Sequence, residues 1–113
     1  MKTPAALSML SALSGETRLA IFRTLVARGG LAAGDLGAHL KMPASTLSFH
    51  LKDLRTAGLI KSERQGRTII YAADVKGLGD LLAFLSQDCC GGHPELCLPD
   101  LAAACKPTPR KTA

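Results

Sequence analysis

Residues 44–60, with the sequence ASTLSFHLKDLRTAGLI, constrain the fold more than any other segment of this 113-residue chain. Leu47, Leu51 and Leu54 fall at positions i, i+4 and i+7, so they form one apolar stripe on a helix. Gly58 is a typical residue to end that helix. The opposite side carries small polar groups, a cation and one aromatic ring: Ser45, Ser48, Phe49 and Lys52. The segment is therefore predicted to be a helix with one buried face and one face open to a partner.

Four further helices are predicted around this segment. The first runs through Leu7, Leu10 and Leu13, and the second carries Leu19, Phe22, Leu25 and Val26 and stops at Gly29-Gly30. A weaker helix over residues 33–40 is followed by a tight turn at Pro43, since proline is tolerated in a first helical turn but not inside a helix. The last helix is capped by Asp74 and has an apolar stripe of Val75, Leu78, Leu82 and Leu85.

Two β-prone runs, LIKSER and RTIIYAA, lie between the central helix and the last one. They are joined through Gln65-Gly66, which predicts a hairpin with Arg64 and Arg67 beside its tip. The predicted fold is mainly α: a winged helix–turn–helix with five helices and a small β-hairpin wing, over residues 1–88. A cysteine-rich segment follows at 89–105, and residues 106–113 form a polar tail that is expected to be disordered.

The distribution of charge predicts that the middle of the chain binds a polyanion. The formal net charge is +5; residues 38–72 hold six basic and two acidic side chains, whereas residues 74–100 hold one basic and five acidic. A helix fits the major groove of DNA, and short serine side chains let its backbone approach closely. Phe49 could pack on thymine methyl groups. The predicted DNA contacts are Ser45, Ser48, Phe49, Lys52 and Arg55 on the helix, and Arg64 and Arg67 on the wing.

The cellular setting follows from what the sequence lacks. No apolar run is long enough to cross a membrane, and the N-terminus has no signal-peptide layout, so the chain is expected in the cytoplasm, where thiols stay reduced. No loop combines an activated thiolate with a cationic pocket, so an enzyme such as a thiol oxidoreductase is not expected.

The stretch CCGGHPELC, residues 89–97, holds three of the four cysteines, and Cys105 follows. Thiolates prefer soft or thiophilic ions, and three of them suit trivalent arsenic or antimony. Zinc bound by all four cysteines, or with His93 replacing one of them, is an alternative, although adjacent cysteines are unusual in zinc sites. A redox switch through a Cys97–Cys105 disulfide is a further alternative, but the acidic surroundings do not favour a reactive thiolate.

Three segments, SGETRLAIFRTL, MPASTLSFHLKDLRTAGLI and RQGRTIIYAAD, resemble the ArsR (ArsR/SmtB) family of winged-helix repressors in order and spacing. The resemblance covers residues 10–85. It implies a homodimer, built from the first and last helices, that represses transcription from a palindromic operator in double-stranded DNA until a toxic metal or metalloid binds. By position it assigns DNA contacts to Ser45, Thr46, Ser48 and Phe49, with Arg64 and Arg67 on the wing. Many relatives have histidine or arginine where this chain has Phe49.

The resemblance also narrows the choice of inducer ion. Some family members carry a cysteine cluster beside the helix before the recognition helix, but this chain has AAGDLG there. Others use aspartate–histidine pairs on the last helix, which has no histidine here. The C-terminal pattern resembles an arsenite-responsive branch that binds the metalloid through a vicinal cysteine pair and one later cysteine. That implies Cys89, Cys90 and Cys97 as ligands of As(III), with Sb(III) as a second candidate and no catalytic cofactor. A zinc- or cadmium-binding regulator, or a thiol redox-sensing repressor, of the same fold is the alternative.

Overall fold

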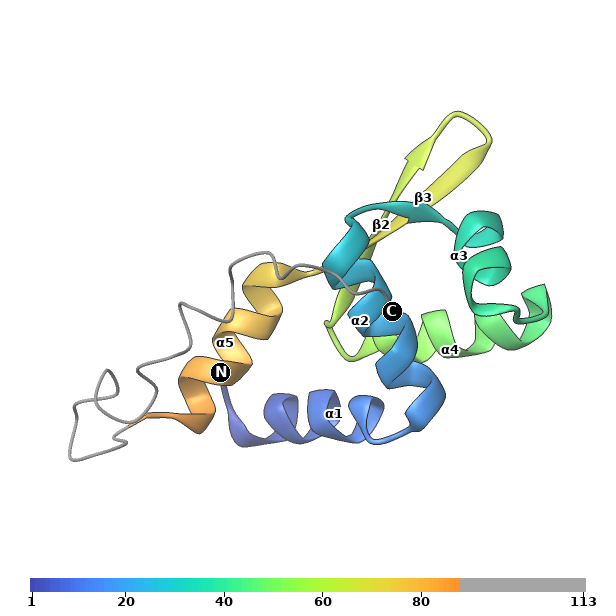
Figure 1. Cartoon of the computed structure of the whole chain (residues 1–113). Helices are drawn as coiled ribbons and strands as arrows, with labels where there is room; N and C mark the ends of the chain where they lie inside the picture. Colours follow the sequence, from blue (N-terminus) through green and yellow to red (C-terminus); the bar gives the residue numbers. More distant parts are fainter. Residues whose placement is uncertain (88–113) are drawn as a thin grey trace, which may run out of the picture.

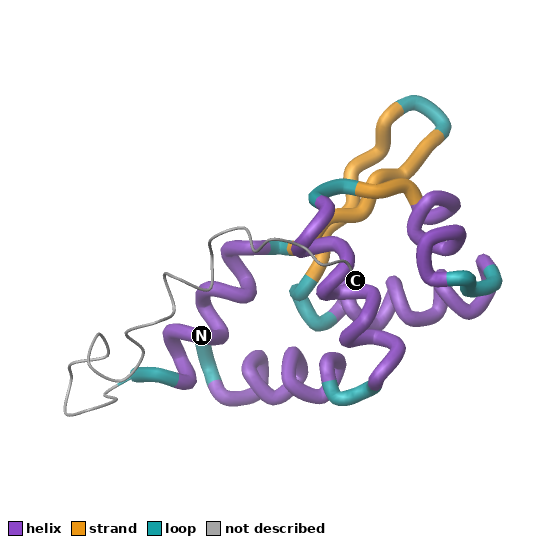
Figure 2. Tube along the Cα trace, in the orientation of Figure 1, coloured by secondary structure: helices purple, strands orange, loops and turns teal. Residues whose placement is uncertain are grey.

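The computed structural model describes residues 1–87, so all four cysteines lie outside the described residues. Figures 1 and 2 show the helices and a small sheet in this part of the chain. The predicted winged helix–turn–helix with five helices and a hairpin is confirmed. In chain order the elements are α1 (Thr3–Leu13), α2 (Glu16–Arg28), β1 (Leu31–Ala32), α3 (Ala33–Leu40), α4 (Ala44–Thr56), β2 (Ile60–Gln65), β3 (Thr68–Ala73) and α5 (Val75–Leu85).

The helix–turn–helix consists of α3, a short turn and α4. Lys41 ends α3 with a φ of 55°, a left-handed conformation that is uncommon for a residue other than glycine. The Met42 N–H donates to the Gly37 carbonyl at 2.9 Å, which closes the turn. Pro43 then precedes α4 directly, with the extended backbone of a helix N-cap position. The turn therefore re-aims the chain within three residues and sets α4 against α3.

The sheet has three antiparallel strands in the order β1-β3-β2, one more than predicted. The extra strand β1 is two residues long, too short to give an alternating pattern in the sequence. Gln65 pairs with Thr68, so Gly66 and Arg67 form the hairpin loop, with Gly66 at a φ of 65°. The predicted join at Gln65-Gly66 was thus wrong by one residue, and Arg67 sits in the loop itself.

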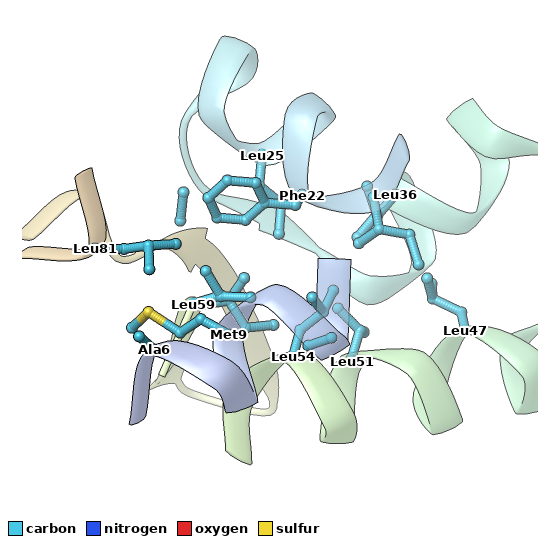
Figure 3. Close-up of a cluster of buried hydrophobic side chains, with 14 residues drawn as sticks. Ala6, Met9, Phe22, Leu25, Leu36, Leu47, Leu51, Leu54, Leu59 and Leu81 are labelled. Atoms are coloured by element: carbon cyan, nitrogen blue, oxygen red, sulfur yellow. The ribbon is translucent and has the colours of Figure 1, made fainter. Parts of the chain in front are cut away.

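A single apolar core joins the helices to the base of the sheet (Figure 3). The stripe of Leu47, Leu51 and Leu54 is buried, as predicted, and meets Leu25 of α2 and Leu36 of α3 within the same cluster. No polar or charged residue is buried in the described part of the chain. Each fully buried leucine contributes about 1.5–3 kcal/mol relative to an exposed one. The buried face of α4 is therefore what fixes the direction of its outer face.

The apolar stripe predicted on the last helix does not pack as a whole against the body of this chain. Leu81 is its buried residue, 3% exposed, whereas Val75 and Leu85 of the predicted stripe are 70% and 55% exposed. Gly77 lies on the side of α5 that faces the body: a Cβ atom there would be 2.6 Å from the Gly58 carbonyl oxygen, so this side of α5 lies against the turn after α4. Asp74 caps the helix as predicted, because its Oδ1 accepts the Gly77 N–H at 3.0 Å. Leu81 and the close backbone approach at Gly77 therefore hold α5 against the body, while Val75, Leu82 and Leu85 stay exposed.

Helices of the described region are all too short or too polar to cross a membrane.

Candidate nucleic-acid interface

The outer face of α4 is open along its whole length. All six predicted contacts on this helix are exposed: Ser45, Thr46, Ser48, Phe49, Lys52 and Arg55. Phe49 is the most conspicuous, since 64% of a large apolar residue is exposed on the side opposite the buried leucines. Phe49 therefore does not fold back into the core.

Phe49 is in contact with the next residue in the chain. The rings of Phe49 and His50 meet edge to face, with centroids 5.6 Å apart and planes at 67°. This is a favourable arrangement for two aromatic rings. His50 is half-buried on the flank of α4. The contact gives the exposed ring a supported position on the recognition face.

An ion pair holds the flank of α4 to α2. Arg18 Nη1 donates to Asp53 Oδ2 at 2.8 Å, and both side chains are partly buried, at 26% and 39% exposure. Sequence reasoning missed this pair, although Asp53 is the only acidic residue of α4. An isolated carboxylate on a helix otherwise basic and polar is the signal that could have indicated a local cationic partner. The pair withdraws one negative charge from the surface that faces a polyanion.

The wing projects from the body of the molecule beyond α3 (Figure 1) and carries exposed cations at its tip. Arg64 and Arg67 are both exposed, and Arg64 Nε donates to the Gly66 carbonyl at 3.2 Å. Arg55 Nη1 reaches Ser62 Oγ of β2 at 3.4 Å, so the end of α4 and the base of the wing are adjacent. Both elements thus belong to one surface.

The cations of this surface are available to phosphate groups. Within residues 1–87, the two ion pairs are Arg18–Asp53 and Lys76–Asp80, and neither involves Lys52, Arg55, Arg64 or Arg67. A helix sized for the major groove, small polar side chains on its outer face, and flanking cations supply both base-edge and phosphate contacts.

Cys89, Cys90 and Cys97, the predicted thiolate ligands, lie outside the described residues. Among residues 1–87, no group of three His, Cys, Asp or Glu side chains is arranged to hold a metal ion. Asp74, on the last helix, is already used as its N-cap.

These features define a winged helix–turn–helix DNA-binding protein. The family described as "Helix-turn-helix domain" matches residues 12–63. The HTH-type transcriptional regulator YgaV of Escherichia coli is 33% identical over 85 residues, which span 75% of this chain and 86% of YgaV. An ArsR-like transcriptional regulator from Rhodococcus has a similar structure, with a TM-score of 0.71, 27% identity and coverage of 93% of this chain and 96% of its own. The chain belongs to the ArsR/SmtB family of winged-helix transcriptional regulators.

A further solved structure with a similar fold is that of a "possible transcriptional regulator for arsenical resistance". It is 31% identical, with a TM-score of 0.62, and the match covers 69% of this chain and 80% of that one. Members of the family are DNA-binding transcriptional regulators, so the predictions of a DNA-binding regulator and of a protein that is not an enzyme are confirmed.

Proposed function

We propose that this protein is an As(III)-responsive repressor. Its homodimer binds operator DNA and is released when As(III), or Sb(III), binds Cys89, Cys90 and Cys97. The observation that carries the proposal is the position of α5: the helix starts against the turn that follows the recognition helix, and the chain continues from its other end into the cysteine segment.

The DNA-binding half of the proposal rests on α4 and the wing. In a dimer, two copies of α4 would enter successive major grooves about one helical turn apart. The serines and Phe49 would face base edges, while Lys52, Arg55 and the two wing arginines would contact phosphates.

The proposed dimer interface is the end of the molecule formed by α1 and α5, which pack against each other away from the wing (Figure 1). These helices carry large exposed apolar side chains, namely Leu7, Leu10, Leu82 and Leu85. In a single copy they would remain in water, and a second copy offers the same apolar surface in return.

The route from ligand to DNA is proposed to run through α5. The Asp74 N–H donates to the Leu59 carbonyl at 2.8 Å, and Gly77 lies against Gly58, so the start of α5 is fixed to the end of the recognition-helix segment. Closing the cysteine segment around one ion would shift α5 and re-space the two recognition helices. A coupling of about 1–3 kcal/mol, typical of allostery, weakens operator binding by roughly 5- to 150-fold.

The identity of the inducer is proposed from ligand chemistry. Soft thiolates select thiophilic ions, and each cysteine loses its proton on binding. ArsR/SmtB regulators respond to metal or metalloid ions, and one protein of similar structure is described as a possible regulator for arsenical resistance.

The test is operator release. Duplexes that bind the full-length protein are selected from random-sequence DNA, and bound DNA is followed by fluorescence anisotropy under reducing conditions. Arsenite, zinc and cadmium are titrated separately. Arsenite is expected to release DNA at the lowest concentration, and Cys89→Ser, Cys90→Ser and Cys97→Ser are each expected to abolish release.

Cys105→Ser is the matched control and should respond to arsenite like the natural protein. Normal arsenite release by Cys89→Ser would refute the proposed site. Release by zinc alone, lost in Cys105→Ser, would instead support the four-thiolate zinc site.

A further inference from the structure

Phe49 is unlike every other aromatic residue of this protein. The chain has three phenylalanines and one tyrosine, all within the described residues. Phe22 is buried, and Phe84 and Tyr71 are partly buried against the core, whereas Phe49 is 64% exposed. Leaving a phenylalanine in water forgoes a large part of its burial free energy. An exposed ring on the recognition helix thus calls for a partner that covers it.

The surroundings of Phe49 restrict what that partner is. The ring lies about 200° around α4 from the buried Leu47, on the side that carries the exposed Ser45 and Lys52. A cation and a short hydroxyl side chain on the same face suit DNA rather than an apolar protein surface. The edge-to-face contact with the half-buried His50 supports the ring before any partner arrives.

The base edges in the major groove offer few matches to such a ring. Guanine and adenine present N7 acceptors together with O6 or N6 groups, and cytosine presents an N4 donor; thymine adds a C5-methyl group. A phenyl ring neither donates nor accepts hydrogen bonds of ordinary strength. Against a polar base edge it would strip water without replacing the lost hydrogen bonds, which is costly. The methyl group is the one apolar feature that it can cover favourably.

We propose that Phe49 is a specificity-determining residue that reads a C5-methyl group, that of thymine, at one position in each operator half-site. The inference rests on the DNA-binding part of the proposed function and is independent of the inducer. It follows that this position tolerates 5-methylcytosine better than cytosine, because methylation restores the apolar contact.

The test removes the methyl group and nothing else. Duplexes selected by the full-length protein are resynthesised with uracil in place of each thymine in turn, which leaves base pairing unchanged. Burying one methyl group is worth about a fourfold change in affinity per half-site, and about fifteenfold when both half-sites are changed. The natural protein is expected to show that loss at one symmetric pair of positions.

The variant Phe49→Ala makes the test specific to this ring. Its affinity for the thymine duplex should fall, and its affinities for the thymine and uracil duplexes should be equal. Ser45→Ala, on the same face of α4, is the matched control and should keep the full difference between the two duplexes. Since Phe49 is exposed, circular dichroism and thermal unfolding should show that Phe49→Ala folds normally.

Three outcomes distinguish a failure of methyl reading by Phe49 from a failure of DNA binding and from a wrong inducer. If uracil has no effect at any position, or the same effect in Phe49→Ala, methyl reading by Phe49 is refuted while DNA binding stands. If the protein selects no DNA, both the proposed function and this inference fail. If arsenite fails to release a duplex that still shows the uracil effect, only the proposed inducer is wrong.

Discussion

Arg18 Nη1 lies 2.8 Å from Asp53 Oδ2, and this ion pair joins α2 to the flank of the recognition helix α4. The two residues are 35 positions apart in the chain, so the pair is a tertiary contact rather than a local one. The buried leucines of α4 also hold this helix, through their contacts in the apolar core. Two kinds of contact, apolar and ionic, therefore hold the same helix, and they differ in strength.

Asp53→Ala should lower the free energy of unfolding by no more than about 1 kcal/mol, because partly exposed ion pairs contribute little. Leu54→Ala, one residue later in the chain, removes a fully buried side chain and should cost about 2–5 kcal/mol. Urea unfolding followed by circular dichroism measures both values. An Asp53→Ala loss equal to that of Leu54→Ala would show that the ion pair, not the leucine stripe, is the main anchor of α4.

Gly77→Ala and Gly79→Ala should change stability in opposite directions, although both place alanine in α5. A Cβ at Gly77 would lie 2.6 Å from the Gly58 carbonyl oxygen, so the backbones must separate at a cost of about 1–3 kcal/mol. Nothing lies within 4 Å of a Cβ at Gly79. There the higher helix propensity of alanine should add up to about 1 kcal/mol.

Thermal unfolding of the two variants beside the natural protein provides the measurement. A Gly77→Ala protein as stable as Gly79→Ala would mean that the approach of α5 to the turn at Gly58 is not tight. Under the proposed function, Gly77→Ala should also reduce the release of DNA by arsenite, because the same contact couples α5 to α4.

The bounds of α3 and the buried stripe of α4 were predictable because clear breakers and regular leucine spacing mark them. Which residues of α5 face the core of the chain was not predictable from the stripe of Val75, Leu78, Leu82 and Leu85, because the Gly77–Gly58 contact depends on a distant turn. The exposure of Phe49 followed from its helical position, whereas the Arg18–Asp53 pair needed the tertiary fold. The DNA contacts and the cysteine ligands remain predictions.

Arg64→Ala and Arg67→Ala should reduce the salt dependence of DNA binding. Each lost phosphate contact flattens the slope of log K against log salt concentration by about 0.9, so one substitution, present twice in a dimer, removes roughly 1.8. Lys76→Ala is the matched control, because Lys76 lies on α5 and already contacts Asp80 at 3.4 Å. Affinities measured by anisotropy at several salt concentrations give the slopes. Unchanged slopes in the wing variants would exclude the arginines from phosphate contact.

Replacing Leu82 and Leu85 together by glutamate should convert the protein to a monomer. Both leucines are exposed on α5, at 40% and 55%, so the folded single chain should tolerate the change, while an apolar interface would have to bury two charges in each copy. Sedimentation velocity should show the mass of one chain, and operator affinity should fall because the two recognition helices are no longer linked. Val26→Glu, an exposed apolar residue on α2 at 48%, is the control and should leave the dimer intact. A dimer that survives the double substitution would place the interface elsewhere.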